Sequence, residues 1–249
     1  MVLENFKKFC EDFREEFILL EKALEKKYYQ NFDGNKNFGE MIFDLRNKKN
    51  KIITYYYKEL DYLRELRNII VHEKIKDCNY IVAPHPYIIE RIKHIRLDIE
   101  NPPTAFKKYA ITNVFTADIN DEILEIMKIM KEKAFTHIPI YNEGQLVGIF
   151  SEYVLFNVIL EQKEIISVNE TFKTIEKYLN EYDEGAEQFE YLNMNTDIFT
   201  VYELFAKAVN NHKRLTVFFT DNAKENGKIL GMITAWDITE KEEDGVKLV

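Results

Sequence analysis

The sequence predicts a mixed α/β (α+β) region made of two repeated units, preceded by an all-α helical-bundle domain. Three observations lead to this prediction. In the first hundred positions, apolar residues recur every three or four residues, as on one face of a helix. After Pro102 and Pro103 the pattern changes to helices that alternate with short apolar strands. That second pattern occurs twice in the same order, which indicates an internal duplication.

Three helices are expected in the N-terminal part. The apolar face of the first consists of Phe6, Phe9, Cys10, Phe13, Phe17, Leu20 and Leu24. This helix should stop at the turn-forming residues around positions 31–35. A second, short helix fits residues 38–45, and a third fits residues 53–72. The third is apolar on most of its circumference, which favours burial inside a bundle or at a dimer interface.

A connecting helix is expected next, with isoleucines at 88, 92, 95 and 99 on one side. It should end before Pro102 and Pro103, because the residue before a proline is disfavoured in the helical region. The predicted organisation is therefore a helical domain at 1–84, a connecting segment at 85–105, and the repeated units at 106–249.

Each repeated unit has a helix followed by a strand–turn–strand hairpin. The expected strands are residues 137–140 and 146–150 in the first unit, and 214–218 and 229–233 in the second. A helical connector at 161–188 should separate them, with Thr171, Ile175, Tyr178 and Leu179 on its inner face. Because neither unit can bury its apolar faces alone, the two should stack against each other.

The hairpins end in similar segments, Gly148-Ile149-Phe150-Ser151 and Gly231-Met232-Ile233-Thr234, and the second continues Ala235-Trp236-Asp237. These segments resemble CBS domains, with the first at about 106–160 and the second at about 189–240. Two such domains in tandem resemble a Bateman module. The resemblance implies a regulatory sensor that binds an adenine nucleotide (AMP, ADP, ATP or S-adenosylmethionine) and signals to the N-terminal helical domain.

The resemblance also implies residue roles. Asp237 would bind the ribose, since a carboxylate can accept hydrogen bonds from both ribose hydroxyls. Thr234 would contact phosphate or ribose, and Arg214 would contact phosphate. The adenine would lie near Phe199 and Thr200.

The first unit departs from this pattern, with Val154 in the place of Asp237 and His137 in the place of Arg214. We therefore expect one nucleotide per chain. The alternative is that Thr234 and Asp237 only cap the last helix, because both are preferred residue types at a helix N-terminus.

The segment Arg67-Asn68-Ile69-Ile70-Val71-His72 resembles the Arg-Asn-x-x-x-His motif of HEPN domains. This resemblance implies a second candidate function, a metal-independent ribonuclease gated by the CBS pair. His72 would act as general base or acid, and Arg67 would stabilise the charge of the phosphorane. Positions five apart lie about 140° apart on an ideal helix, so the helix must distort near His72 or two chains must contribute. The structural alternative is that both side chains pair with nearby carboxylates or cap carbonyls.

Composition restricts the remaining possibilities. The formal net charge of -9 opposes non-specific binding to nucleic acid. Cys10 and Cys78 lie outside any metal-binding spacing, so we expect no metal site and two free thiols in a reducing compartment, with a disulfide between them as the alternative. No apolar run approaches the ~20 residues of a membrane span, and the N-terminus has no signal-peptide pattern. The predicted location is the cytoplasm.

The preferred interpretation is a regulatory binding protein that is not an enzyme. Its expected partners are an adenine nucleotide, a second copy of the chain in a homodimer, and an unidentified effector protein. RNA is a partner only if the ribonuclease alternative holds. A third possibility is an interaction scaffold whose CBS pair binds no ligand.

Overall fold

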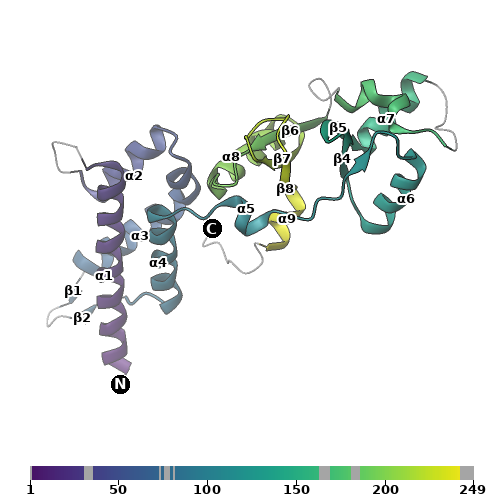
Figure 1. Cartoon of the computed structure of the whole chain (residues 1–249). Helices are drawn as coiled ribbons and strands as arrows, with labels where there is room; N and C mark the ends of the chain where they lie inside the picture. The colour runs from purple at the N-terminus through teal and green to yellow at the C-terminus, as the bar shows by residue number, and fades with distance from the viewer. Residues whose placement is uncertain are drawn as a thin grey trace. The chain divides into compact units, whose positions relative to one another are not determined.

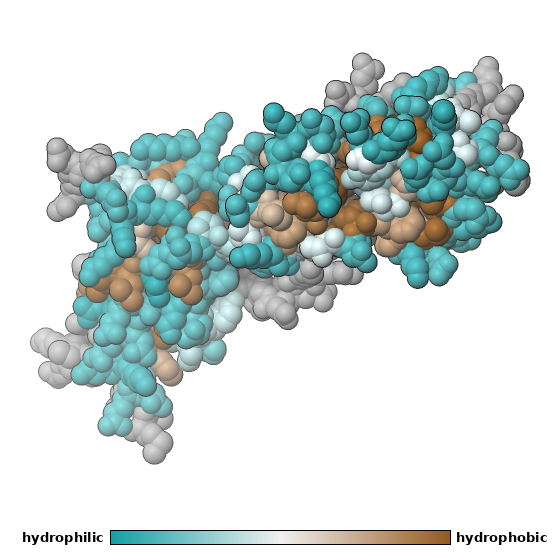
Figure 2. All heavy atoms as spheres, viewed as in Figure 1, coloured by the Kyte–Doolittle hydropathy of each residue, from teal (hydrophilic) through white to brown (hydrophobic). Residues whose placement is uncertain are grey.

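The computed structural model describes residues 2–30, 36–72, 74–75, 79–80, 82–162, 169–180 and 186–241. The chain divides into two compact units, Met1–Pro103 and Thr104–Gly245, which are described in turn (Figure 1). On both units polar side chains cover most of the visible surface, with apolar patches between them (Figure 2). Within the described residues, no helix is both long enough and apolar enough to cross a membrane.

The first unit is helical, as predicted. Its helices are α1 (Val2–Tyr28), α2 (Phe38–Asn47), α3 (Lys51–His72) and α4 (Pro86–Glu100), and the short strands β1 (Lys74–Ile75) and β2 (Asn79–Tyr80) pair antiparallel. Helix α1 packs along α4, and α2 packs on α3. The sequence predicted a connecting helix at the position of α4. In the structure this helix is part of the packed bundle.

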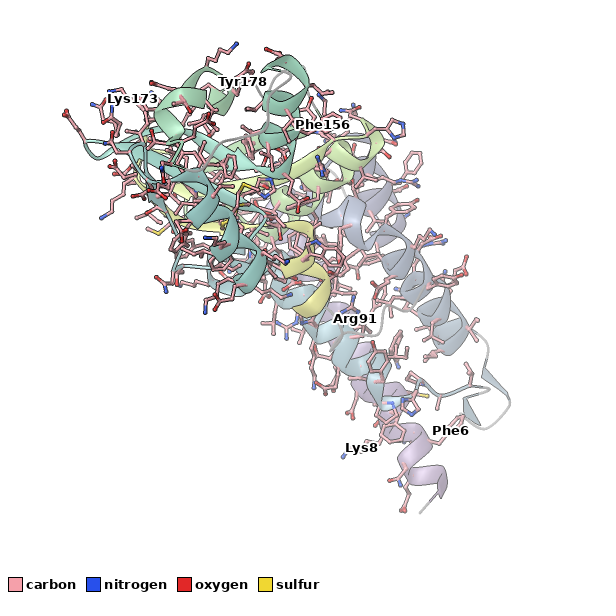
Figure 3. The ribbon with its side chains drawn as sticks, turned by 90° about the vertical axis from the view of Figure 1, so that its right-hand side faces the viewer. Phe6, Lys8, Arg91, Phe156, Lys173 and Tyr178 are labelled. Carbon is pink, nitrogen blue, oxygen red and sulfur yellow. The ribbon has the colours of Figure 1, made fainter. Side chains whose placement is uncertain are left out.

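A largely buried ion pair joins α3 to α4 in this unit. Arg91 donates from Nε and NH2 to the two carboxylate oxygens of Glu59, at 2.7 and 2.9 Å. Close by, the hydroxyl of Tyr56 donates to the carboxylate of Asp98. Figure 3 labels Arg91 on its helix. The polar groups of this cluster satisfy one another, so burying them does not leave an unpaired charge.

The second unit begins with α5 (Ala105–Tyr109) and contains two motifs. The first comprises β3 (Ala117–Asp118), α6 (Ile123–Lys133), β4 (His137–Asn142), β5 (Gln145–Ser151) and α7 (Glu152–Gln162). A 3-10 helix, η1 (Phe172–Asn180), follows it. The second motif comprises β6 (Glu187–Leu192), α8 (Ile198–Asn210), β7 (Arg214–Thr220), β8 (Ile229–Ile233) and α9 (Ala235–Lys241).

Both motifs have the same sheet topology. In the first, β3 is parallel to β4 and β4 is antiparallel to β5; in the second, β6, β7 and β8 repeat this arrangement. The predicted duplication is therefore confirmed. The sequence predicted the two hairpin strands of each motif, but not the parallel third strands β3 and β6.

The two motifs share apolar packing through β5. Successive residues of a strand point to opposite faces of the sheet. Phe150 faces the core of the first motif, together with residues of α6, α7 and η1. Its neighbour Ile149 packs instead with Phe218 and Met232 of the second motif. One strand thus contributes to both cores, as expected for stacked units.

The motif glycines lie where the hairpins are covered by other segments. A Cβ on Gly148 would lie 2.2 Å from the carbonyl oxygen of Leu179 in η1. A Cβ on Gly231 would lie 2.9 Å from the ring of Phe106 in α5. Helix η1 therefore covers the first hairpin, and the segment that precedes the first motif covers the second.

Candidate functional site

A cavity of about 310 Å³ lies where the first hairpin strand of each motif begins. This volume is at the lower end of the range of small-molecule sites. The first motif contributes Thr136, His137 and Glu152, and the second contributes Glu187, Phe205, Ala208, Val209, Lys213, Arg214, Leu215, Thr216, Thr234, Ala235 and Trp236. The cavity therefore joins residues of both halves of the duplication.

Thr234 connects β8 to α9 on the wall of this cavity. Asp237 accepts two hydrogen bonds on Oδ2, from the backbone N–H of Thr234 at 2.7 Å and from its hydroxyl at 2.8 Å. This geometry is one half of a capping box, in which a side chain of the first turn bonds back to the residue before the helix. The capping role considered for these two residues is thus present in the structure, and it fixes Asp237 beside the cavity wall.

Glu187 is the buried carboxylate of the cavity, with only 3% of its surface exposed. Its Oε2 accepts a 2.6 Å hydrogen bond from the hydroxyl of Ser151, and its Oε1 lies 3.3 Å from Nε2 of His137. Arg214 NH2 lies 3.8 Å from the same oxygen. Glu187 therefore connects one residue of its own motif with two residues of the other.

Burial alone would raise the pKa of Glu187. The nearby His137 imidazole, the hydrogen bond of Ser151 and the charge of Arg214 outweigh it, so the pKa lies below that of an ordinary glutamate. The carboxylate is therefore held in its charged form, as expected for a buried anion with three partners.

The two motifs match a family model, the CBS domain, at residues 106–161 and 186–244. The chain contains a pair of CBS domains. The expected tandem arrangement is thereby confirmed, with α6 to α7 in the first CBS domain and α8 to α9 in the second. No curated protein matches the sequence.

Several solved structures are similar to part of this chain, and one of those described below is a CBS-domain pair. One, in complex with 5′-methylthioadenosine and S-adenosyl-L-methionine, has 20% sequence identity and a TM-score of 0.39, and the match covers 56% of this chain and 94% of that one. CBSX2, in complex with AMP, has 16% identity and a TM-score of 0.38, over 55% and 93% of the two chains. An uncharacterized conserved protein from Pyrococcus horikoshii has 15% identity and a TM-score of 0.43, over 60% and 98%.

Two exposed side chains of the second CBS domain lie at the cavity. The Arg214 side chain is 60% exposed, although its guanidinium lies near Glu187. Trp236 is 74% exposed and is the only tryptophan of the chain. A cation and an aromatic ring that line one cavity can contact an anionic group and a flat ring of the same ligand.

The five residues expected to contact a nucleotide do not all lie together. Arg214 and Thr234 line the cavity, and Asp237 is bonded to Thr234. Phe199 and Thr200 lie at the start of α8, whereas Arg214 follows the end of that helix. A helix of this length separates its ends by roughly 15–20 Å at 1.5 Å per residue.

The start of α8 has its own hydrogen bonds. Asp197 accepts from the backbone N–H of Thr200 at 2.9 Å and from its hydroxyl at 2.7 Å. Phe199 is buried in the domain core. Neither Phe199 nor Thr200 is among the described residues that line the cavity. Their proposed contact with adenine stays a prediction.

The residues of the HEPN-like motif lie at the end of α3. The guanidinium of Arg67 donates a 3.2 Å hydrogen bond to the amide oxygen of Asn68 and lies 5.9 Å from the ring centre of Phe17. The His72 side chain lies outside the described residues. The catalytic roles of Arg67 and His72 stay predictions.

The sequence predicted no metal site and two free thiols. Across the described part of the chain, no group of three or more His, Cys, Asp or Glu side chains is placed to hold a metal ion. Cys10 is a buried free thiol, whose Sγ lies 3.4 Å from the carbonyl oxygen of Val82. Cys78 lies outside the described residues.

Sequence reasoning missed Glu187 and Trp236 as cavity residues. The position of Trp236 between Thr234 and Asp237 was a usable signal, because the intervening residues of such a motif lie at the same helix start. Glu187 gave no such signal, since its place depends on the parallel pairing of β6 with β7. The alternation of apolar Phe189 and Tyr191 with polar residues was the only indication of that strand.

Proposed function

We propose that this chain is a regulatory protein whose CBS pair binds one adenine-containing ligand in the cavity beside Thr234, Arg214 and Trp236. Binding changes the packing of the two CBS domains, and an effector protein or the N-terminal helical unit responds to that change. A ligand can act in this way only if it prefers one of two arrangements of the pair. In this proposal the chain is a sensor and not an enzyme.

The observation that carries the proposal is the construction of the cavity from both CBS domains. A ligand that fills it contacts Thr136 and His137 on one side and Arg214 and Thr234 on the other. It also approaches the 3.8 Å contact between Arg214 and Glu187, which an anionic group of the ligand can weaken. Such a ligand therefore acts directly on groups that link the two domains.

The fluorescence of Trp236 can be used to test this proposal. Because Trp236 is the only tryptophan and lines the cavity, its fluorescence reports changes at that cavity. We would titrate the full chain with AMP, ADP, ATP, 5′-methylthioadenosine and S-adenosylmethionine, and record melting curves at a hundredfold excess over the measured dissociation constant. A ligand that binds only the folded protein then stabilises it by about 2.7 kcal/mol.

Variants of the cavity make the test specific. Asp237→Asn keeps an acceptor for Thr234 and removes the carboxylate charge, and Arg214→Met removes the cation. We expect the first to weaken every adenosyl ligand and the second to weaken only those with phosphate. Thr239→Ala, in the same helix and bonded only to carbonyl oxygens of its own turn, is the matched control. If no adenosyl ligand changes the fluorescence or the melting temperature, the scaffold interpretation replaces the sensor.

The homodimer belongs to the same proposal. Helix α7 exposes three large apolar side chains, Phe156, Ile159 and Leu160, whose spacing places them on one face. Their exposed fractions are 58%, 43% and 58%, and Figure 3 labels Phe156. A second copy of the chain that presents the same face would bury this stripe symmetrically.

A further inference from the structure

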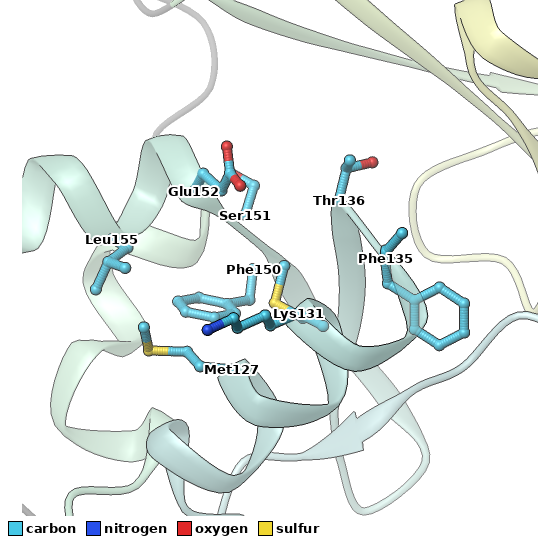
Figure 4. A pocket seen from close by; sticks show the side chains of 10 residues that line it. Met127, Lys131, Phe135, Thr136, Phe150, Ser151, Glu152 and Leu155 are labelled. Atoms are coloured by element: carbon cyan, nitrogen blue, oxygen red, sulfur yellow. The ribbon is translucent and has the colours of Figure 1, made fainter.

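A second pocket lies entirely within the first CBS domain, and its volume is about 540 Å³. Figure 4 shows it between α6 and the start of α7. The lining residues are Met127, Met130, Lys131, Ala134, Phe135, Thr136, Phe150, Ser151, Glu152 and Leu155. Apart from two charges and two hydroxyls, this lining is apolar, as in most sites that bind small organic molecules.

The duplication relates this pocket to the cavity of the second domain, but its chemistry differs. Ser151 corresponds to Thr234, whereas Val154 stands where the second domain has Asp237. Val154 is buried in the core, so that position offers no acceptor for ribose hydroxyls. The hydroxyl of Ser151 is already bonded to Glu187. The first-domain pocket therefore suits an apolar group better than a sugar.

Lys131 is the positive charge of this pocket. On the same helix, Lys128 pairs with Glu125 at 2.6 Å, whereas Lys131 makes no ion pair within the described residues. Figure 4 draws Lys131 on α6 and Glu152 at the start of α7, among the side chains that line the pocket. The two charged groups of the lining therefore come from different helices.

We propose that the first CBS domain binds a small amphiphilic carboxylate. Its carboxylate pairs with Lys131, and its apolar body packs against Met127, Phe150 and Leu155. A medium-length fatty acid and an aryl-alkanoic acid share this chemistry. The pocket shares Thr136 and Glu152 with the adenosyl cavity, but Lys131 and the apolar residues that would hold the ligand line this pocket alone, so the proposal does not depend on the function proposed above.

Calorimetric titration of the full chain with octanoate and 4-phenylbutyrate tests this, with octanol and 4-phenylbutanol as uncharged counterparts. We expect one carboxylate to bind per chain. Tighter binding of octanoate would indicate a fatty acid as the ligand, and tighter binding of 4-phenylbutyrate would indicate an aryl-alkanoic acid. Lys131→Met should weaken carboxylate binding about fivefold, the factor for an ion pair near the surface, and leave alcohol binding unchanged. Lys128→Met is the matched control and should bind like the wild type.

Three results would overturn the proposal. The first is no binding of either carboxylate, and the second is equal affinity in Lys131→Met and the wild type. The third is displacement of the carboxylate by an adenosyl ligand, which would make the first-domain pocket a nucleotide site. A carboxylate should also leave the Trp236 fluorescence unchanged, because Trp236 lines only the other cavity. Calorimetry with carboxylates therefore tests this proposal, and Trp236 fluorescence with adenosyl ligands tests the sensor proposal.

Discussion

The hydroxyl of Ser151 donates a 2.6 Å hydrogen bond to Oε2 of Glu187 and so joins the last residue of β5 to the first residue of β6. The same hydroxyl oxygen accepts from the backbone N–H of Val154 at 3.3 Å, in the first turn of α7. One side chain therefore starts a helix of the first CBS domain and binds a strand of the second. Because the acceptor is the buried carboxylate of Glu187, this link between the two domains depends on the charge of that group.

Glu187→Gln should destabilise the CBS pair by about 2 kcal/mol at neutral pH, because it removes the charge from a buried hydrogen-bonded acceptor. The folded-state pKa of Glu187 is lowered, so its contribution is complete above the pKa of the unfolded chain. It is lost as the pH falls through the lower folded-state value. Urea unfolding followed by circular dichroism at about pH 7 and about pH 3 measures the difference between variant and wild type, which should shrink in acid.

Glu190→Gln is the control for this prediction. Glu190 lies on the same strand, is partly exposed and accepts one hydrogen bond from Gln188. Its substitution should change stability little at either pH. A gap between Glu187→Gln and the wild type that stays constant from neutral to acid pH would show that the carboxylate charge is not what holds the link.

Glu59→Gln should destabilise the helical unit by about 3 kcal/mol, because it leaves the largely buried Arg91 without its charged partner. The two side chains are 9% and 12% exposed. Hydrogen exchange of peptides from α3 and α4 measures the loss within this unit. Glu90→Gln, which breaks the exposed pair with Lys93, should leave exchange unchanged. Equal exchange in both variants would mean that the α3–α4 packing does not need the ion pair.

Gly148→Ala should destabilise the first CBS domain by about 3 kcal/mol, because a methyl group at this site overlaps the backbone carbonyl of Leu179. Gly144→Ala provides the comparison. Gly144 has a positive φ of 80° and open space around it, so its cost should be only about 1 kcal/mol, from backbone strain. Thermal unfolding measures the loss of stability in each variant. A larger loss in Gly144→Ala than in Gly148→Ala would show that η1 moves away from the hairpin at little cost.

Phe156→Asp should convert a dimer to a monomer, because it places a charge in the apolar stripe of α7. Light scattering during gel filtration measures the molar mass directly. Leu97→Asp, at an apolar side chain of α4 that is 52% exposed, is the control and should keep the mass of the wild type. A wild type that runs as a monomer at micromolar concentration would contradict the homodimer.

Local sequence pattern was sufficient for much of the fold. The spacing of apolar residues defined α1, α2 and α3, and the two Gly-x-x-Ser/Thr segments located both hairpins, because these features depend on neighbouring residues. Of the four expected inner-face residues, Ile175, Tyr178 and Leu179 are buried, although their segment is a 3-10 helix, whereas Thr171 precedes that helix and is only half-buried. The buried Phe172 was not included in that face.

Local sequence pattern did not predict the elements that depend on pairing between distant parts of the chain. Strand β3 has two residues and β6 has alternating side chains in a polar region, so neither produces a strong local signal. Their partners in the sheet lie about twenty or more residues away, and only the folded topology brings Glu187 to Ser151 and His137. The first-domain pocket is likewise formed by α6 and α7, whose apolar residues the sequence could assign only to a core.

Residues 105–111 come before the first strand of the first CBS domain, yet they cover the second domain. Ile111 bonds through its backbone to Met232 in both directions, at 2.9 and 3.0 Å, and the ring of Phe106 covers Gly231. During synthesis this segment leaves the ribosome about 120 residues before its partner strand, and domains generally fold in the order of their synthesis. The second CBS domain can therefore close only when its last strand returns to the beginning of the module. A fragment cut between the two domains would leave an uncovered apolar segment on one piece and an uncovered hairpin on the other.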